Sequence, residues 1–239
     1  DMSLREKRAL LVLAGVVFLL CFLLFYGRGE TGAKTDALDH ISYVARSLDT
    51  GRLFPDDSFF KGGDGEGFDP RKGIWHPVIS LWAWQADTSA AYLWINIPSF
   101  LAFFYLLAFW VFSRELLRSI PLAALASLLF LVMYRGGGVE WLVKSGYSKN
   151  LMQMLFWMST VYLLRYLREG RGWNLAALSV LALMGAAVHA VYAYIFGSMV
   201  LSIGIFIVFS TRRAEWGRRL LRALPFVIVL AGVPLLVRT

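Results

Sequence analysis

Two carboxylates, an imidazole and a phenol are spaced as on one side of a helix within residues 35–51, TDALDHISYVARSLDTG. Asp36, His40 and Tyr43 fall in one row of such a helix, and Asp39 precedes Tyr43 in the neighbouring row. A carboxylate that nearby apolar surface partly desolvates can act as a general base or bind a sugar hydroxyl or a cation. We therefore take Asp36 and Asp39 as candidate catalytic residues. The alternative is that they only cap a surface helix.

A second group of acids lies in the glycine-rich segment KGGDGEGFDPRKG, residues 61–73. Its carboxylates, Asp64, Glu66 and Asp69, offer the oxygen ligands that a hard divalent cation prefers. Their spacing does not match the EF-hand pattern, and a solvated loop is the alternative. A divalent cation is the one cofactor that the sequence suggests.

The composition is that of a membrane protein. Of the 239 residues, 58% are hydrophobic and only 17% are charged, and the mean hydropathy is +0.60, which is too apolar for an ordinary soluble domain. The basic residues occur in short clusters between apolar runs, where they act as topology signals and as anchors for anionic lipid, so nucleic acid is not an expected partner. The single cysteine, Cys21, excludes a disulfide framework within the chain and a cysteine-based metal site.

Uncharged apolar runs predict an all-α, polytopic bundle of about seven transmembrane helices, each needing ~20 residues. The runs are Ala9 to Tyr26, Thr88 to Ser113, Ser119 to Tyr134, Leu151 to Leu164, two helices within Gly172 to Thr211 with a turn near His189 to Tyr194, and Ala223 to Val237. This pattern divides the chain into a first transmembrane helix at 1–27, a loop at 28–88 with the candidate active site, and a six-span bundle at 89–239.

The distribution of charge predicts the orientation. With the N-terminus in the cytoplasm, the cytoplasmic segments hold thirteen Lys and Arg, whereas the short outer segment 135–150 holds three. Residues 28–88, with ten of the sixteen acids and a net charge of −3, are then extracytoplasmic. We predict an integral protein of the plasma membrane, which in a bacterium is the inner membrane.

Two amphipathic helices are expected inside the long loop. One follows Asp36 and ends at Gly51, with an apolar stripe at Ile41, Val44, Ala45 and Leu48. The other covers residues 74–86, IWHPVISLWAWQA, whose tryptophans are typical of a helix at the headgroup level.

Basic and imidazole side chains are expected near the same side of the membrane. Arg135 and Lys144 suit the phosphate of a lipid-linked substrate, although lipid-headgroup anchors are the alternative. His76 and His189 are ionisable residues beside or within apolar runs, which makes them candidates for function; neutral imidazoles bonded to a neighbouring helix are equally consistent.

This pattern resembles the polytopic glycosyltransferases of the GT-C superfamily, which includes protein O-mannosyltransferases and aminoarabinose transferases. The elements that carry the resemblance are the first apolar run, the segment TDALDHISYVARSLDTG, the PDDSFF that follows it, and the helix around IWHPVISLWAW. The likeness in topology covers the whole chain, and its specific part is about forty residues. The chain departs from the family in having no D-x-D motif.

The resemblance implies a sugar donor on a polyprenyl phosphate and an acceptor hydroxyl deprotonated by Asp39 or Asp36. It also implies that His40, His76, Lys144 or His189 meets the donor phosphate. Walker A, Rossmann, HExxH and GxSxG motifs do not occur, which argues against an ATP-driven enzyme, a dehydrogenase or a common hydrolase. The expected partners are membrane lipids and the lipid-linked donor. The alternative function is that of a non-catalytic subunit with protein partners in a larger membrane complex.

Overall fold

The computed structural model describes residues 4–27, 36–55, 72–132, 146–189, 191–192 and 194–199, and the single residues 202 and 221. The prediction of an all-helical chain is confirmed for these residues, since every regular element among them is a helix. The elements are α1 (Leu4–Phe25), α2 (Ala37–Thr50), α3 (Trp75–Gln85), α4 (Ala90–Leu117), α5 (Ile120–Val132), α7 (Ser148–Glu169) and α8 (Gly172–Val188).

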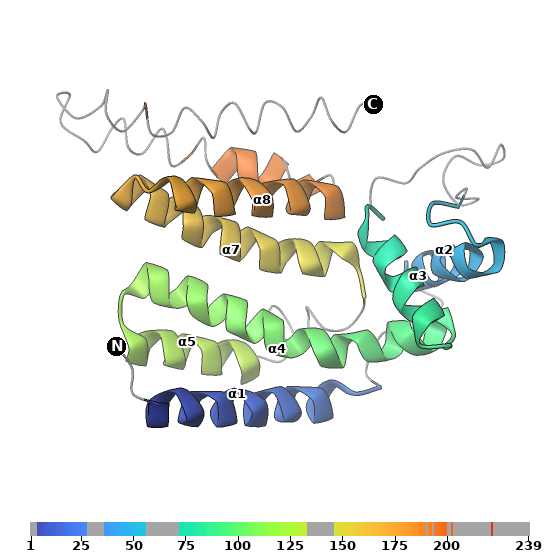
Figure 1. Ribbon diagram of the computed structural model, residues 1–239, viewed down its shortest axis with the longest axis horizontal. Helices are drawn as coiled ribbons and strands as arrows, with labels where there is room; N and C mark the ends of the chain where they lie inside the picture. The colour runs from blue at the N-terminus through green and yellow to red at the C-terminus, as the bar shows by residue number, and fades with distance from the viewer. Residues whose placement is uncertain are drawn as a thin grey trace.

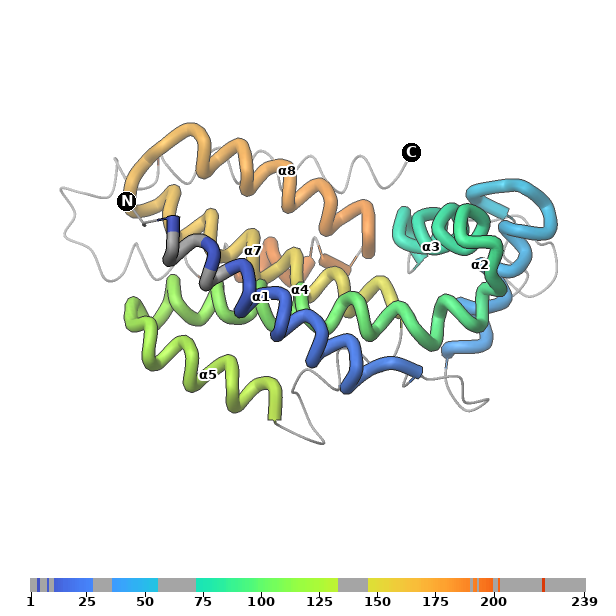
Figure 2. The backbone as a smooth tube through the Cα atoms, turned by 60° about the horizontal axis from the view of Figure 1, so that its bottom comes forward, coloured from blue at the N-terminus to red at the C-terminus, as the bar shows by residue number. Residues whose placement is uncertain are grey.

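Five helices lie side by side, and two cover one end of them. Helices α1, α4, α5, α7 and α8 run along the long axis of the molecule, and α2 and α3 gather at the end where α4 begins (Figures 1 and 2). Helix α4 is central, because it contacts α1, α5 and α7 along its length and also touches α2 and α3. The candidate catalytic residues of α2 are therefore held at one end of the bundle.

Among the described helices, α4 is the one that is long and apolar enough to cross a membrane. Its 28 residues correspond to roughly 42 Å, which exceeds the ~30 Å of a bilayer's hydrocarbon core. The Ser89 side chain caps its start by accepting a hydrogen bond from the Tyr92 amide, and Arg118 ends it in the left-handed conformation at φ 52°. The apolar parts of α1, α5 and α8 are shorter.

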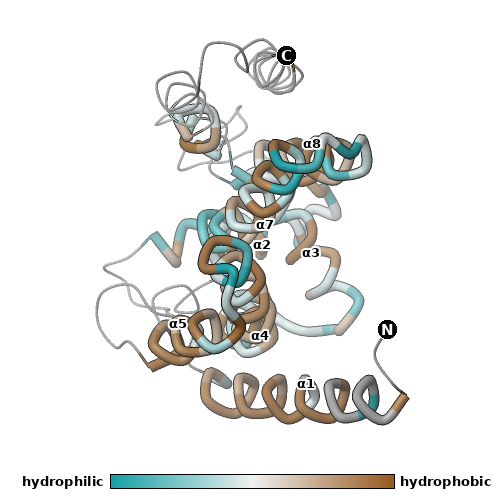
Figure 3. Tube along the Cα trace, turned by 90° about the vertical axis from the view of Figure 1, so that its left-hand side faces the viewer, coloured by the Kyte–Doolittle hydropathy of each residue, from teal (hydrophilic) through white to brown (hydrophobic). Residues whose placement is uncertain are grey.

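Helix α1 shows apolar side chains on nearly all sides. It is brown along most of its coloured length in Figure 3, and Leu11, Leu19 and Leu23 are more than half exposed. Among the α1 side chains that the structure describes, Cys21 and Phe25 are buried, and they pack in a cluster with residues of α4. A helix that is apolar all round is expected to be surrounded by other apolar groups, from protein or from lipid.

The two helices expected in the long loop are present. Helix α2 ends at Gly51, which adopts the left-handed conformation (φ 65°), as its sequence predicts. Val44 of the predicted stripe is fully buried, and the stripe's other residues pack beside it. Helix α3 matches the tryptophan-rich segment. Asp36 occupies the N-cap position of α2, but its side chain makes no capping hydrogen bond.

The predicted break near His189 is also confirmed. Helix α8 stops at Val188, His189 has an extended backbone (φ −157°, ψ 121°), and helical residues resume at 191. The glycine-rich acids and the last apolar run, Ala223 to Val237, lie outside the described residues.

Candidate active site

An ion pair joins the first turn of α2 to the turn of residues 72–74 that leads into α3. Lys72 Nζ lies 2.8 Å from Asp39 Oδ1; the lysine side chain is 0% exposed and the aspartate side chain 17% exposed. The ammonium also lies 4.9 Å from the centre of the Tyr43 ring, a cation–π distance. A buried ammonium needs such partners, because removing an unpaired charge from water is costly. Asp39 is thus held in place by Lys72 while keeping some contact with solvent.

A histidine pair continues this network inward. His40 Nδ1 lies 2.8 Å from His76 Nε2, and His76 Nδ1 lies 2.6 Å from the Lys72 carbonyl oxygen. Because a carbonyl can only accept, His76 must carry its proton on Nδ1. A neutral His76 then accepts at Nε2, so His40 donates from Nδ1. For two neutral rings, this one backbone carbonyl fixes the proton of each ring on Nδ1.

Aromatic side chains from α4 and the start of α7 enclose the histidine pair. Trp94 stacks on His40 at 5.7 Å and 13°, and the Tyr147 ring meets His40 edge-on at 4.9 Å. The Trp94 indole nitrogen is buried and has no hydrogen-bond partner among the described residues. The imidazole of His40 is thereby fixed in orientation within a largely apolar enclosure.

Helix α8 helps to position Lys72, because the next residue in the chain, Gly73, packs against the end of α8. Gly73 has φ +50°, and a Cβ atom there would clash with the carbonyl oxygens of Ala187 and Val188. The next residue, Ile74, donates its amide hydrogen to the Ala187 carbonyl at 2.9 Å. Only glycine fits this close approach in a left-handed conformation. His189 follows Val188 directly, so the end of α8 brings it beside the segment that carries Lys72.

Three of the predicted site residues are brought together. Asp39, His40 and His76 belong to one network, and His189 lies at the adjacent end of α8, where its Nδ1 accepts a hydrogen bond from the Val191 amide. Asp36 is exposed and its side chain contributes none of the contacts described above. The predicted phosphate-binding residues Arg135 and Lys144, and the predicted metal ligands Asp64, Glu66 and Asp69, lie outside the described residues.

Within the described ranges, no group of three or more His, Cys, Asp and Glu side chains is arranged to hold a metal ion. The charged groups of the site instead offset each other, because the Asp39 carboxylate faces the Lys72 ammonium. The arrangement offers a carboxylate as proton acceptor, an adjacent ammonium and an oriented imidazole.

Sequence reasoning missed three members of the site, Lys72, Trp94 and Tyr147. Lys72 precedes His76 by four residues, a spacing that could have drawn attention to it as the start of a helical row. Trp94 lies within a long apolar run, where nothing distinguishes it from an ordinary core residue.

Comparison with protein-family models, with curated proteins and with solved structures finds no match to this chain. The case for a function therefore depends on the residues and their geometry.

Proposed function

We propose that the chain is a membrane glycosyltransferase of GT-C type, or the N-terminal membrane module of one. In this proposal it moves a sugar from a polyprenyl-phosphate donor to an acceptor hydroxyl on the extracytoplasmic face. The bundle would span the membrane about seven times with its N-terminus in the cytoplasm. The observation that carries the proposal is the partly exposed Asp39, held by buried Lys72 beside the His40 and His76 pair at one end of α4.

In the reaction that we propose, Asp39 accepts the proton of the acceptor hydroxyl. The hydroxyl oxygen forms a bond to the anomeric carbon, the bond from that carbon to the phosphate oxygen breaks, and its electron pair leaves on the carrier phosphate. A positioned base of this kind typically contributes about 10²- to 10⁴-fold in rate. Cationic or hydrogen-bond-donating side chains stabilise the charge that develops on the leaving phosphate.

The hydrogen bonds of His40, His76 and His189 indicate different roles for the three side chains. Both ring nitrogens of His76 are engaged, one with the Lys72 carbonyl and the other with His40. We therefore assign His76 as a positioning residue rather than a phosphate ligand. A neutral His40 that donates from Nδ1 has no proton on Nε2, so it could meet a phosphate only as an imidazolium. His189, whose Nδ1 accepts from the Val191 amide and whose proton is therefore on Nε2, is the better candidate donor to the phosphate.

A specific observation also favours the alternative, a non-catalytic subunit of a larger membrane complex. His40, Lys72 and His76 are each at most 5% exposed and bonded to one another. A hydrogen-bonded network of this kind can also hold α2 against α3 without any catalytic role. If the chain is a transferase, the ionised Asp39 carboxylate is needed for the reaction as well as for folding. If it is a structural subunit, the carboxylate is needed for folding alone.

The test uses the full chain released gently from its own membrane. Native mass spectrometry that detects a co-purifying polyprenyl phosphate, or its glycosylated form, would support the transferase. Its loss in a His189→Ala variant, with retention in Asp36→Asn, would tie the carrier phosphate to the site. Stoichiometric protein partners without carrier lipid would instead favour the structural subunit.

An activity assay with the identified carrier then separates chemistry from folding. Asp39→Asn combined with Lys72→Met removes both charges, so neither is left buried alone. We expect this double variant to be folded and at least about 100-fold less active, as for the loss of a general base. Asp36→Asn, which alters an exposed carboxylate three residues away, should stay near the parent's activity. A double variant with full activity would refute the role of Asp39.

A further inference from the structure

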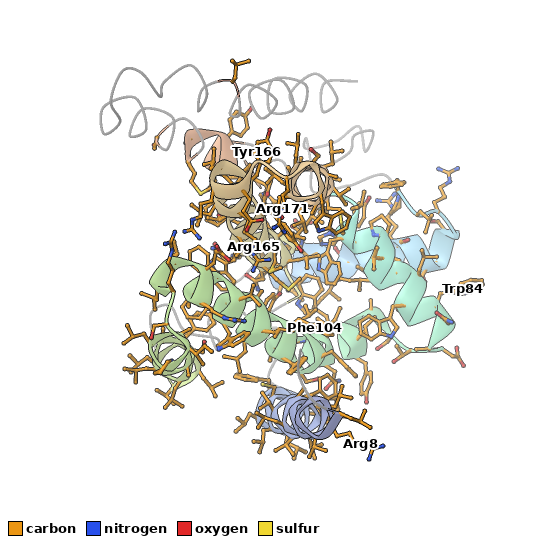
Figure 4. All side chains as sticks on the ribbon, turned by 60° about the vertical axis from the view of Figure 1, so that its left-hand side comes forward. Arg8, Trp84, Phe104, Arg165, Tyr166 and Arg171 are labelled. Carbon is orange, nitrogen blue, oxygen red and sulfur yellow. The ribbon has the colours of Figure 1, made fainter. Side chains whose placement is uncertain are left out.

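Four arginines gather at the opposite end of α4 from Asp39. Arg114 and Arg118 come from the end of α4, and Arg165 and Arg168 come from the last turns of α7. Together with Glu115 they line a cavity of about 760 Å³ between α4, the start of α5, and α7. Figure 4 shows Arg165 in the region where α7 faces α4. The sequence predicted that these bases set the topology and anchor anionic lipid, without indicating a defined site.

The cavity keeps a positive excess even though it contains a carboxylate. Glu115, 13% exposed, pairs with Arg165 Nε at 2.8 Å and also with Arg168. One carboxylate faces four guanidinium groups, each of which has five N–H donors, so donors remain for a second anion. Arg114 lies 5.5 Å from the Trp110 ring, an aromatic contact that helps to hold its guanidinium in place.

An apolar groove adjoins the arginine cavity. The groove, of about 520 Å³, runs between α1, α4 and α5 and is lined almost entirely by apolar side chains such as Leu13, Val17 and Leu128. Trp110 belongs to the walls of both the groove and the arginine cavity. A molecule with a phosphate and an alkyl chain can therefore occupy both at once.

The position of the arginine cavity along α4 suits a lipid headgroup. Trp94, beside the candidate active site, and Arg114 are twenty residues apart in α4, which corresponds to roughly 30 Å along a helix. That length matches the hydrocarbon thickness of a bilayer, about 30 Å. With α4 crossing the membrane as proposed, the arginines would lie at the level of the lipid phosphates on the face opposite Asp39.

We propose that Arg114, Arg118, Arg165 and Arg168 bind the phosphate of an anionic phospholipid, with one of its acyl chains in the groove between α1, α4 and α5. Guanidinium groups suit this ligand, because their planar forks donate pairs of hydrogen bonds to phosphate oxygens. Basic pockets between membrane helices are known to bind anionic headgroups. The inference rests on the proposed membrane-spanning bundle, but not on the proposed transferase chemistry.

The test measures which lipid stays bound to the full chain. The protein is reconstituted in nanodiscs of equal phosphatidylglycerol and phosphatidylcholine, extracted in mild detergent and examined by native mass spectrometry. We expect retained phosphatidylglycerol to exceed retained phosphatidylcholine, and Arg114→Gln with Arg118→Gln to lower that ratio about tenfold. Arg171→Gln is the matched control, because Arg171 is on the same side, is 76% exposed and does not line the cavity.

Two further variants keep the proposal testable if loss of arginines impairs folding. Glu115→Gln removes the carboxylate that competes for Arg165 and Arg168, so it should raise the retained fraction of phosphatidylglycerol. Ala124→Trp fills the apolar groove and should lower phosphatidylglycerol retention while leaving binding of inorganic phosphate unchanged. Equal retention of the two lipids by the parent chain would overturn the proposal. So would full displacement of phosphatidylglycerol by millimolar inorganic phosphate, which would mark a site for free phosphate.

Discussion

Lys72 is wholly buried, yet its Nζ lies 2.8 Å from the carboxylate of Asp39, a residue 33 positions away that keeps 17% of its side chain exposed. Because one partner is buried and the other is partly exposed, the two side chains depend on each other to different degrees. The lysine depends on the aspartate for a counter-charge, whereas the aspartate can reach solvent or a substrate. The same contact joins α2 to the turn that leads into α3, so stability and any chemistry at Asp39 are linked.

The first prediction concerns the stability of this pair. Asp39→Asn leaves the Lys72 charge buried without its counter-charge and should lower the free energy of unfolding by about 2–3 kcal/mol. This is less than the ~3–5 kcal/mol of a fully buried pair, because Asp39 is partly exposed. Adding Lys72→Met should recover most of the loss. Thermal unfolding of the four proteins in a double-mutant cycle measures the coupling. Additive effects would mean that the two side chains do not interact in the folded protein.

The second prediction concerns the approach of Gly73 to α8. Gly73→Ala combines a positive φ with a clash against two backbone carbonyls, so the start of α3 must move away from Ala187 and Val188. Gly51→Ala is the matched control, because Gly51 also has a positive φ (65°) but no atom within 4 Å of an added Cβ.

We expect Gly51→Ala to cost about 1–2 kcal/mol, the strain of a left-handed residue, and Gly73→Ala to cost clearly more. Loss of the polyprenyl phosphate in Gly73→Ala, but not in Gly51→Ala, would link this contact to the site. Equal melting temperatures for the two variants would show that α3 does not dock on α8 in this way.

The third prediction compares two tryptophans of α3. Trp75 is 8% exposed, and its Nε1 donates to the Gly146 carbonyl at 2.6 Å. Trp84, labelled in Figure 4, is 75% exposed. Trp75→Phe removes the donor and should destabilise the chain by about 1–3 kcal/mol, because the buried carbonyl loses its partner. Trp84→Phe should change stability by less than about 0.5 kcal/mol. Chemical unfolding followed by circular dichroism tests the difference.

The fourth prediction tests orientation with cysteines. The sole native cysteine, Cys21, is 2% exposed, so the parent chain should react slowly with a charged maleimide. In a Cys21→Ala background, Asp49→Cys should be labelled from outside intact cells, and Gly172→Cys only after permeabilisation. Both positions are exposed in the structure. Labelling of residue 172 from outside would reverse the proposed topology.

Much of the architecture was readable from local sequence. The apolar runs of α4, α5 and α8, the stop at Gly51 and the break at His189 each depend on residues within a few turns, because helix formation and capping are local. The candidate role of Asp39 also came from the sequence, through its position beside His40. Asp36 appeared equivalent to Asp39 in sequence, and only the fold separates them, since Asp36 is exposed and makes no capping hydrogen bond whereas Asp39 pairs with Lys72.

What the sequence alone determined is the helical class, the order of the apolar segments and the charge asymmetry between the long loop and the rest. Only the tertiary structure decided that Lys72 pairs with Asp39, that His76 orients His40, and that Glu115 lies among arginines from another helix. These contacts join positions 33, 36 and 50 residues apart. Hydropathy and spacing describe one helix at a time, whereas such contacts depend on how helices pack against each other, which is set by side-chain packing across the whole bundle.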